Sequence, residues 1–238
     1  MPPTANILLE TERLILRRVT LADLDDMARL NGDAAVMRYI GDGAVWTRAQ
    51  SEARIRRIQK IYDIFPGLGL WVGEEKPARR FIGAFALIYV PKTVEVEVGY
   101  RLRVSAWGRG LATEGARALV RYGMYELGLD RVIGLTHPDN DASKHVLMKA
   151  GLEARGVGRY YGRDLAYFVA EAKERGRLLI QVCLRRQMVV PWCSAITTAM
   201  VCLMRFPRIH RGGSSPGRIP EKVLLGGQKT WLDWEHKR

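Results

Sequence analysis

The chain has 238 residues, of which 47% are hydrophobic, 8% aromatic and 26% charged, and its formal net charge is +13. This composition fits a soluble domain with a sizeable core and an additional extension. The start of the chain, MPPTANILLETERLIL, contains prolines and acids that interrupt its apolar run, which argues against a secretory signal peptide. We therefore expect a cytoplasmic protein.

The first third of the chain predicts one strand and two helices. Residues 8–17 predict a strand, and residues 20–31 predict a helix in which Thr20 and Asp23 resemble a capping box, with Asp in place of Glu or Gln. Residues 47–62 predict a basic helix. The apolar side of that helix carries Ile55, Ile58, Ile61 and Tyr62. Its arginines form either a solvated face or, as the alternative, one wall of a substrate site.

Three further strands are predicted near residues 68–74, 80–89 and 94–104. In the third, apolar residues recur at every second position: Val94, Val96, Val98, Tyr100, Leu102 and Val104. The residues between them share the opposite face: Glu95, Glu97, Gly99, Arg101 and Arg103. Glu97 can therefore point away from the core. The alternative is an ion pair with Arg101 or Arg103 on a solvated face.

A turn with two glycines follows, where the apolar period changes from two residues to 3.6. The helix after it is marked by Ala112, Ala116, Leu119, Gly123 and Leu127. Gly108 and Gly110 lie within the change of period, and their lack of side chains lets a ligand approach the main chain. A turn of this kind presents backbone N–H groups to an anion at the positive end of a helix.

Spacing distinguishes three phosphate-binding patterns at this turn. The dinucleotide fingerprint requires glycine where Thr113 stands, and the nucleoside-triphosphate loop requires lysine where Ala116 stands. The pattern x-x-x-Gly-x-Gly/Ala is met by WGRGLA, residues 107–112. This stretch resembles the acetyl-CoA pyrophosphate loop of the GCN5-related N-acetyltransferases, the GNAT superfamily.

A second motif strengthens the resemblance. Residues 130–152, DRVIGLTHPDNDASKHVLMKAGL, predict a strand near 131–136, a break at Pro-Asp-Asn and a helix near 141–150. The family run N-x-x-S-x-x-V-L-x-K-x-G-F is matched at Asn140, Ser143, Lys149 and Gly151, with Leu152 where Phe is commoner.

The stretches EVGYRL and TERLILRRVTLADLDDMARL resemble the branch that acetylates the N-termini of ribosomal proteins. The resemblance covers about residues 8–171, including two last strands near 153–158 and 164–170. An antiparallel meander followed by a βαβ-like unit predicts an α/β (α+β) fold, with a mixed, mostly antiparallel central sheet and helices on both faces. We expect residues 1–171 to form the acetyltransferase domain.

The resemblance implies transfer of an acetyl group from acetyl-CoA to a primary amine, such as a protein N-terminus or a small amine. The loop amides would bind the pyrophosphate, the end of the preceding strand would run beside the pantetheine arm, and the second motif would complete the cofactor site. The implied cofactor-binding residues are Leu102, Val104, Gly108, Arg109, Gly110, Leu111, Ala112, Asn140, Ser143 and Lys149. The acceptor would bind near residues 31–65 and 155–163.

The catalytic residues implied are Glu97 and Ser143. Glu97 stands where the branch's E-I-G-Y carries its glutamate, so it is the candidate general base. Leu147 stands where other branches have a tyrosine that protonates the leaving thiolate. Ser143 is then the nearest hydroxyl, with Tyr160 and Tyr161 as further donors. The alternative is that Asn140 and Ser143 only cap the helix that follows Pro138.

The tail after Glu171 differs from the rest of the chain. It carries 13 Lys/Arg and 4 Asp/Glu, so +9 of the total of +13 lies there. Met188–Met204 has no charge, but it is short for a membrane span and contains proline and hydroxyl residues, which disfavours a spanning helix. A surface contact or a helix packed on the domain is the favoured alternative, followed by a disordered basic linker, RIHRGGSSPGRIPEK.

Other features leave the remaining alternatives open. Cys183, Cys193 and Cys202 match no zinc spacing, and His137 and His145 are isolated, so no metal site is predicted. A non-catalytic acyl-CoA-binding domain and a protein that binds nucleic acid through its basic tail remain alternative functions. The sequence is compatible with a monomer or a dimer.

Overall fold

The computed structural model describes residues 7–172, and the predictions for the tail lie outside this range. The strands are β1 (Ile7–Glu10), β2 (Leu14–Arg18), β3 (Gly69–Glu75), β4 (Arg80–Tyr89), β5 (Val96–Leu102), β6 (Arg131–Thr136), β7 (Glu153–Tyr160) and β8 (Arg163–Glu171). The α-helices are α1 (Leu24–Asn31), α2 (Ala34–Met37), α3 (Arg48–Ile64), α4 (Leu111–Tyr125) and α5 (Asp141–Lys149). Two 3₁₀ turns are η2 (Leu21–Asp23) and η3 (Val104–Ala106).

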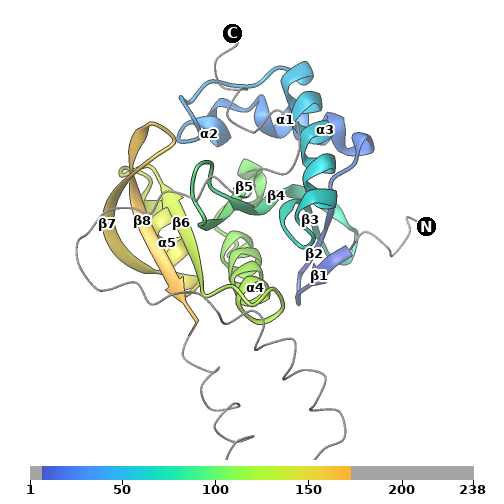
Figure 1. The fold of residues 1–238 in the computed structure, drawn as a ribbon. Helices are drawn as coiled ribbons and strands as arrows, with labels where there is room; N and C mark the ends of the chain where they lie inside the picture. The colour runs from blue at the N-terminus through green and yellow to red at the C-terminus, as the bar shows by residue number, and fades with distance from the viewer. Residues whose placement is uncertain (1–6, 173–238) are drawn as a thin grey trace, which may run out of the picture. The chain divides into compact units, whose positions relative to one another are not determined.

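The strands of residues 7–172 form one eight-stranded sheet in the order β1-β2-β3-β4-β5-β6-β8-β7 (Figure 1). Neighbouring strands are antiparallel except β5 and β6, which run parallel. This parallel pair joins the N-terminal meander to the C-terminal part of the sheet through α4. The predicted α/β (α+β) fold with a mixed, mostly antiparallel sheet is confirmed.

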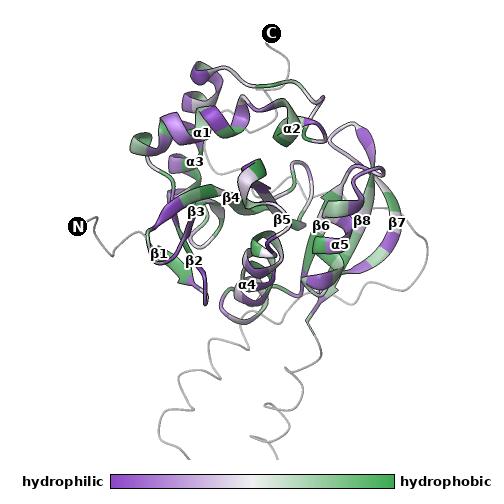
Figure 2. Ribbon diagram, turned by 180° about the vertical axis from the view of Figure 1, so that it is seen from behind, coloured by the Kyte–Doolittle hydropathy of each residue, from purple (hydrophilic) through white to green (hydrophobic). Residues whose placement is uncertain are grey.

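Helices cover both faces of the sheet, and each layer has its own core (Figure 1). Helices α1 and α3 pack with β3 and β4 around Met27, Ile58 and Val72. On the other face, α4 and α5 pack against the sheet around Phe85 and Leu119. In Figure 2 purple and green segments alternate along α1 and α4, as expected for helices with one buried side.

Helix α4 approaches the sheet closely because of one glycine. A Cβ added at Gly115 would lie 2.2 Å from the ring of Phe85, which is fully buried. The start of α4 is therefore held tightly over the centre of the sheet, and with it the loop that precedes the helix.

The single strand predicted at residues 8–17 is wrong, because two antiparallel strands occupy this stretch. Between them Thr11 forms a turn: its N–H donates to the Leu14 carbonyl and its Oγ1 accepts from the Leu14 N–H, both at 2.9 Å. The predicted helix at 20–31 begins as expected, with the Asp23 carboxylate accepting from the Thr20 N–H at 2.8 Å, but its first turn is the 3₁₀ turn η2.

The predicted strand at 94–104 is too long at both ends. Val94 and Val104 are exposed, at 72% and 45%, so the alternating apolar pattern holds only within β5. The short helix α2 was not predicted, because four residues give too little periodicity; the Asp33 side chain caps it by accepting from the Ala35 N–H.

Two further features of residues 7–172 bear on function. No helix in this range is long and apolar enough to cross a membrane. Within the same residues, no group of three or more His, Cys, Asp or Glu side chains is arranged to hold a metal ion.

Candidate active site

The glycine turn lies between η3 and the N-terminus of α4. Gly108 and Gly110 have φ values of 70° and 75°, in the region that favours glycine, and the first backbone hydrogen bond of the helix runs from Glu114 to Gly110 at 3.0 Å. The N–H groups of Leu111, Ala112 and Thr113 therefore have no partner within the helix. These amides point out of the positive end of the helix dipole, which suits an anion.

Two arginines brace this turn. Arg13, directly before β2, donates through Nε to Glu114 at 2.6 Å and through Nη1 to the Arg109 carbonyl at 3.0 Å. The Arg109 guanidinium pairs with Glu75 at the end of β3, and this pairing lowers the pKa of the Glu75 carboxyl. The resemblance implied that Arg109 binds the pyrophosphate, but in this structure its guanidinium already has a carboxylate partner. Arg13, which sequence analysis missed, lies 3.6 Å from where a Cβ at Gly110 would stand.

The strand before the turn has an edge without a strand partner. Strands β5 and β6 pair at one position, Glu97 with Ile133. Within residues 7–172 the rest of β5 therefore has no paired strand on that side. Leu102, at the end of β5, is buried with 4% exposure, and its carbonyl accepts from the Trp107 indole at 2.8 Å. The buried side chain of Leu102 can therefore not reach a ligand, so Leu102 can contribute only its main chain. Val104 is exposed.

Glu97 lies on the α1–α3 face of β5, as the alternating pattern predicts. Tyr161, in the turn between β7 and β8, donates its hydroxyl to Glu97 Oε2 at 2.6 Å. Burial raises the pKa of Glu97 to about 7, and the hydrogen bond from Tyr161 opposes that shift. In the part of the chain that the structure describes, Glu97 forms no ion pair with Arg101 or Arg103, so the alternative of a solvated ion pair is not observed.

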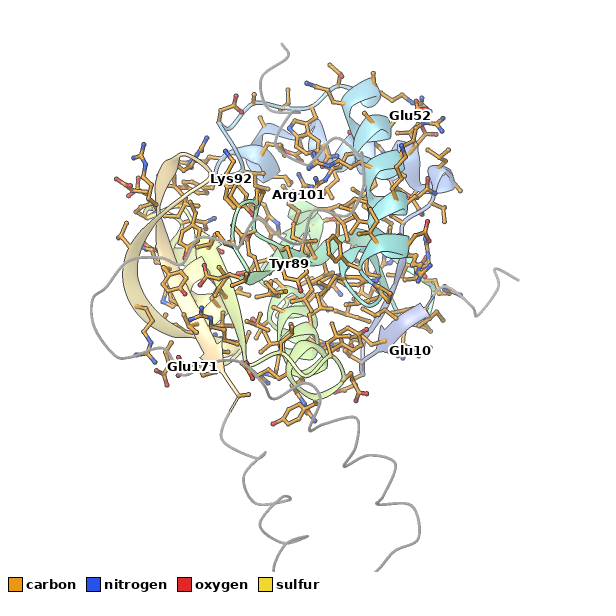
Figure 3. All side chains as sticks on the ribbon, in the orientation of Figure 1. Glu10, Glu52, Tyr89, Lys92, Arg101 and Glu171 are labelled. Carbon is orange, nitrogen blue, oxygen red and sulfur yellow. The ribbon has the colours of Figure 1, made fainter. Side chains whose placement is uncertain are left out.

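Two arginines lie on the same side of the sheet. Arg101 stacks over the Trp46 ring, 5.1 Å from its centroid, and its Nη1 lies 3.6 Å from Met37 Sδ. Burial lowers the pKa of Arg101 to about 10, with nearby Arg54 as the second cause. On α3 the Nε of Arg54 is buried and has no hydrogen-bond partner in the described part of the chain. Figure 3 shows Arg101 on the side of the sheet that α1 to α3 cover.

The arginine face of α3 is therefore only partly solvated. Arg48 and Arg56 are exposed and pair with Asp25 and Glu52. Arg54 instead falls on the buried side of the helix, and it interacts electrostatically with Tyr161. The sequence is compatible both with a solvated arginine face and with one wall of a substrate site.

The second motif brings Ser143 to Tyr100. The Tyr100 hydroxyl lies 3.0 Å from both Ser143 Oγ and the Ser143 carbonyl oxygen, and burial raises the pKa of Tyr100. The Asn140 side chain accepts from the Ser143 N–H at 3.1 Å, so Asn140 caps α5 as the alternative interpretation expected. Tyr100 was assigned to the apolar face from the sequence, and its hydroxyl contact was missed.

Leu147 and Lys149, also in the second motif, make other contacts than the Tyr100–Ser143 pair. Leu147 is buried, and its Cδ2 would lie 2.5 Å from a Cβ added at Gly134. No hydroxyl occupies the position of the tyrosine found in other branches. Lys149 is exposed at the end of α5, where its carbonyl accepts from Arg117 at 2.6 Å.

The chain is similar to known acetyltransferases in sequence and in fold. The family model described as an acetyltransferase (GNAT) domain matches residues 13–153. An uncharacterized N-acetyltransferase from Bacillus subtilis, YoaA, is 31% identical over 155 residues, covering 65% of this chain and 87% of the relative. The FsC-acetyl coenzyme A-N(2)-transacetylase of Aspergillus fumigatus is 34% identical over 152 residues, covering 60% and 64%.

Solved structures share the fold. An acetyltransferase from Agrobacterium tumefaciens superimposes with a TM-score of 0.61 at 23% identity, covering 69% of this chain and 94% of that one. RimL, the ribosomal L7/L12 alpha-N-protein acetyltransferase solved with coenzyme A, gives a TM-score of 0.59 at 15% identity and covers 69% and 97%. The glycine turn, the sheet order and the match over more than half of the sequence lead to one conclusion: this chain belongs to the GNAT acetyltransferase family.

Proposed function

We propose that this protein transfers the acetyl group of acetyl-CoA to a primary amine, with Glu97 as the general base. The observation that carries the proposal is the position of Glu97. It is a carboxylate whose pKa is raised by burial to about 7, at the point where β5 and β6 separate, on the strand that leads into the glycine turn. A base with a pKa near neutrality is suited to remove a proton at neutral pH.

The residues of the turn fit the pyrophosphate of coenzyme A. Free amides at the start of α4 supply donors, and a Cβ added at Gly108 would meet no atom within 4 Å, so nothing in the described chain covers that side. Gly108 to Ala112 would bind the anion through the main chain, and the Arg13 guanidinium lies close by, with Nη2 3.6 Å from where a Cβ at Gly110 would stand. The bound coenzyme supplies the thioester that the amine attacks.

Glu97 would act on the acceptor amine. An amine is protonated at neutral pH and must lose a proton before its lone pair can form the new amide bond. Glu97 accepts that proton, directly or through water, while the Tyr161 hydroxyl holds the carboxylate in place by its 2.6 Å hydrogen bond.

The thiolate that departs as the C–S bond breaks needs a proton. With buried Leu147 at the position of the family's tyrosine, the hydroxyl pair Tyr100–Ser143 is the candidate donor, because its oxygens lie 3.0 Å apart on the opposite face of β5 from Glu97. The raised pKa of Tyr100 keeps this hydroxyl protonated throughout the neutral range.

A panel of primary amines incubated with acetyl-CoA tests the proposal, with release of free thiol as the readout. The panel includes peptides with free N-termini and small amines, because the acceptor is a protein N-terminus or a small amine. Amine-dependent thiol release with formation of the acetylated amine supports an acetyltransferase. Tight binding of acetyl-CoA without transfer to any amine would favour the second candidate, a non-catalytic acyl-CoA-binding domain, which the buried Leu147 motivates.

A further inference from the structure

Arg54 lies on a side of α3 that faces the protein interior. One turn away on the same side are Ser51 and Ile58, with 1% and 0% exposure. The Arg54 Nε atom is buried with no hydrogen-bond partner among residues 7–172, although part of the side chain remains accessible. Leaving a charged donor buried without a partner is costly, so such a group calls for an acceptor.

Arg101 reaches the same region from β5. Its contacts are the Trp46 ring and the Met37 sulfur, neither of which carries a negative charge. Thioether sulfur is a weak acceptor, and an aromatic ring engages the flat face of the guanidinium rather than its N–H edge. Residues 7–172 therefore leave most of the donor capacity of Arg101 unused.

Arg54 is close enough to Arg101 to disfavour the positive charge of Arg101. Burial, and then the neighbouring arginine, lowers the pKa of Arg101, and burial together with Arg57 lowers the pKa of Arg54. Within residues 7–172, no carboxylate lies within 4.0 Å of the guanidinium of Arg54 or Arg101. By contrast, Arg48 and Arg56 on α3 pair with Asp25 and Glu52, and Arg79 pairs with Glu74 on β3.

A glycine lies between Arg101 and Glu97 on β5. Gly99 stands between them on the same face of β5, and a Cβ added there would meet only the Ala86 methyl, at 3.8 Å. Four residues of strand separate the two Cα atoms by roughly 13 Å. Tyr161, which bonds Glu97, is also the residue with which Arg54 interacts electrostatically. Glu97 and Arg101 thus flank Gly99, where β5 carries no side chain, and Tyr161 connects Arg54 to the same region.

We propose that the acceptor amine carries an anionic group, a carboxylate or a phosphate, which binds between Arg54 and Arg101 while the amine lies at Glu97. This inference rests on the proposed acetyl transfer and specifies its substrate class. Guanidinium groups bind both anions through paired N–H donors, and a site with two partly buried arginines would disfavour a neutral isostere because their donors would be left unpaired.

The first test compares matched amines that differ in charge. β-Alanine and γ-aminobutyrate are each compared with the corresponding amide, and phosphoethanolamine is compared with ethanolamine, with acetyl-CoA at saturation. We expect the anionic member to have a kcat/KM higher by ~10-fold or more in at least one pair. The carboxylate pairs and the phosphate pair separate the two anion chemistries.

Arginine variants connect any preference to this site. Arg54→Met and Arg101→Met should reduce the charge preference to near unity, because kcat/KM for the anionic amine falls to the level of its neutral counterpart. The controls are Arg56→Met, on the exposed side of α3, and Arg103→Met, two residues further along on the same face of the chain. Both controls should keep the preference. Transfer without a charge preference, or a preference that survives in both test variants, overturns the inference and leaves the acetyltransferase proposal intact.

A binding measurement covers the case in which no amine in the panel is acetylated. Inorganic phosphate and acetate are titrated into the full chain saturated with coenzyme A, with thermal unfolding followed at constant ionic strength. Stabilisation that is lost in Arg54→Met and Arg101→Met supports the anion site even if the proposed transfer fails. Equal stabilisation of wild type and both variants, or none, contradicts it.

Discussion

Tyr161 and Glu97 are 64 residues apart in the sequence, yet the Tyr161 hydroxyl donates to the Glu97 carboxylate at 2.6 Å. The contact joins the β7–β8 turn to the middle of the sheet. It fixes the orientation of the carboxylate, and it moderates the rise in its pKa that burial causes.

Replacing Tyr161 by phenylalanine should raise the pKa of Glu97 above about 7, because the hydrogen bond that favours the charged carboxylate is lost. The acid limb of the pH profile of kcat/KM should then move to higher pH. Tyr160→Phe is the matched control, since the Tyr160 hydroxyl donates to Glu95 at 2.7 Å and not to Glu97. An identical acid limb in Tyr161→Phe and wild type would show that the limb reports another group.

Glu97→Gln should stabilise the folded protein at alkaline pH. A carboxyl whose folded pKa is raised from 4.5 to about 7 binds its proton more tightly in the folded state. The stability this provides is complete below pH 4.5 and is lost as the pH rises through about 7, after which folding must bury a charge. The glutamine variant avoids that cost, so we expect it to be more stable than wild type by ~1–3 kcal/mol at alkaline pH.

Urea unfolding of both proteins across this pH range measures the difference, which should vanish below pH 4.5. Glu126→Gln, at an exposed position at the end of α4, is the control and should show no such trend. Parallel stability curves for Glu97→Gln and wild type would mean that Glu97 is well solvated.

Gly110→Val should abolish binding of acetyl-CoA. The left-handed φ of 75° is strained for a β-branched residue by ~1–3 kcal/mol, and the new side chain would stand where the anion approaches the amides. Gly128→Val is the control, because Gly128 has a φ of 67° and open space around it but lies beyond the far end of α4. Calorimetry should show loss of affinity in the first variant only. Wild-type affinity in a folded Gly110→Val protein would place the pyrophosphate elsewhere.

A chain that ends at Ala172 should fold and bind acetyl-CoA. Residues 7–172 contain the whole eight-stranded sheet and both helical layers, and each site residue named above lies within them. Circular dichroism and calorimetry on the shortened protein provide the measurement. Insoluble expression would show that residues 173–238 contribute to the fold.

The periodicity and capping patterns of the sequence predicted those parts of the site that lie within a single strand, turn or helix. The two-residue period placed Glu97 opposite the valines of β5, and the change of period located the turn at Gly108 and Gly110. Asn140 was offered as a cap because capping is a relation between residues three positions apart. The role of Glu97 itself stays a prediction.

The partners contributed by distant elements could not be predicted. Nothing in the periodicity of residues 153–171 indicates that Tyr161 meets Glu97, and the apolar alternation hid the hydroxyl contact of Tyr100. The burial of the Arg54 Nε atom depends on how α3 packs against the sheet. The helical pattern of residues 47–62 does not show which of its arginines face the protein interior. The pattern of residues 8–17 predicts one strand because the Thr11 turn contains neither glycine nor proline to mark it.

The most direct test of the account is the turnover of Glu97→Gln at neutral pH with saturating acetyl-CoA and an accepted amine. Glutamine keeps the shape of the side chain and can still accept the Tyr161 hydrogen bond, so affinity for acetyl-CoA should be unchanged. We predict that kcat falls by ~10²-fold or more and partly recovers as the pH is raised, because more of the amine then arrives neutral. Near-normal turnover of Glu97→Gln at neutral pH would contradict the account and would reduce Glu97 to a positioning residue.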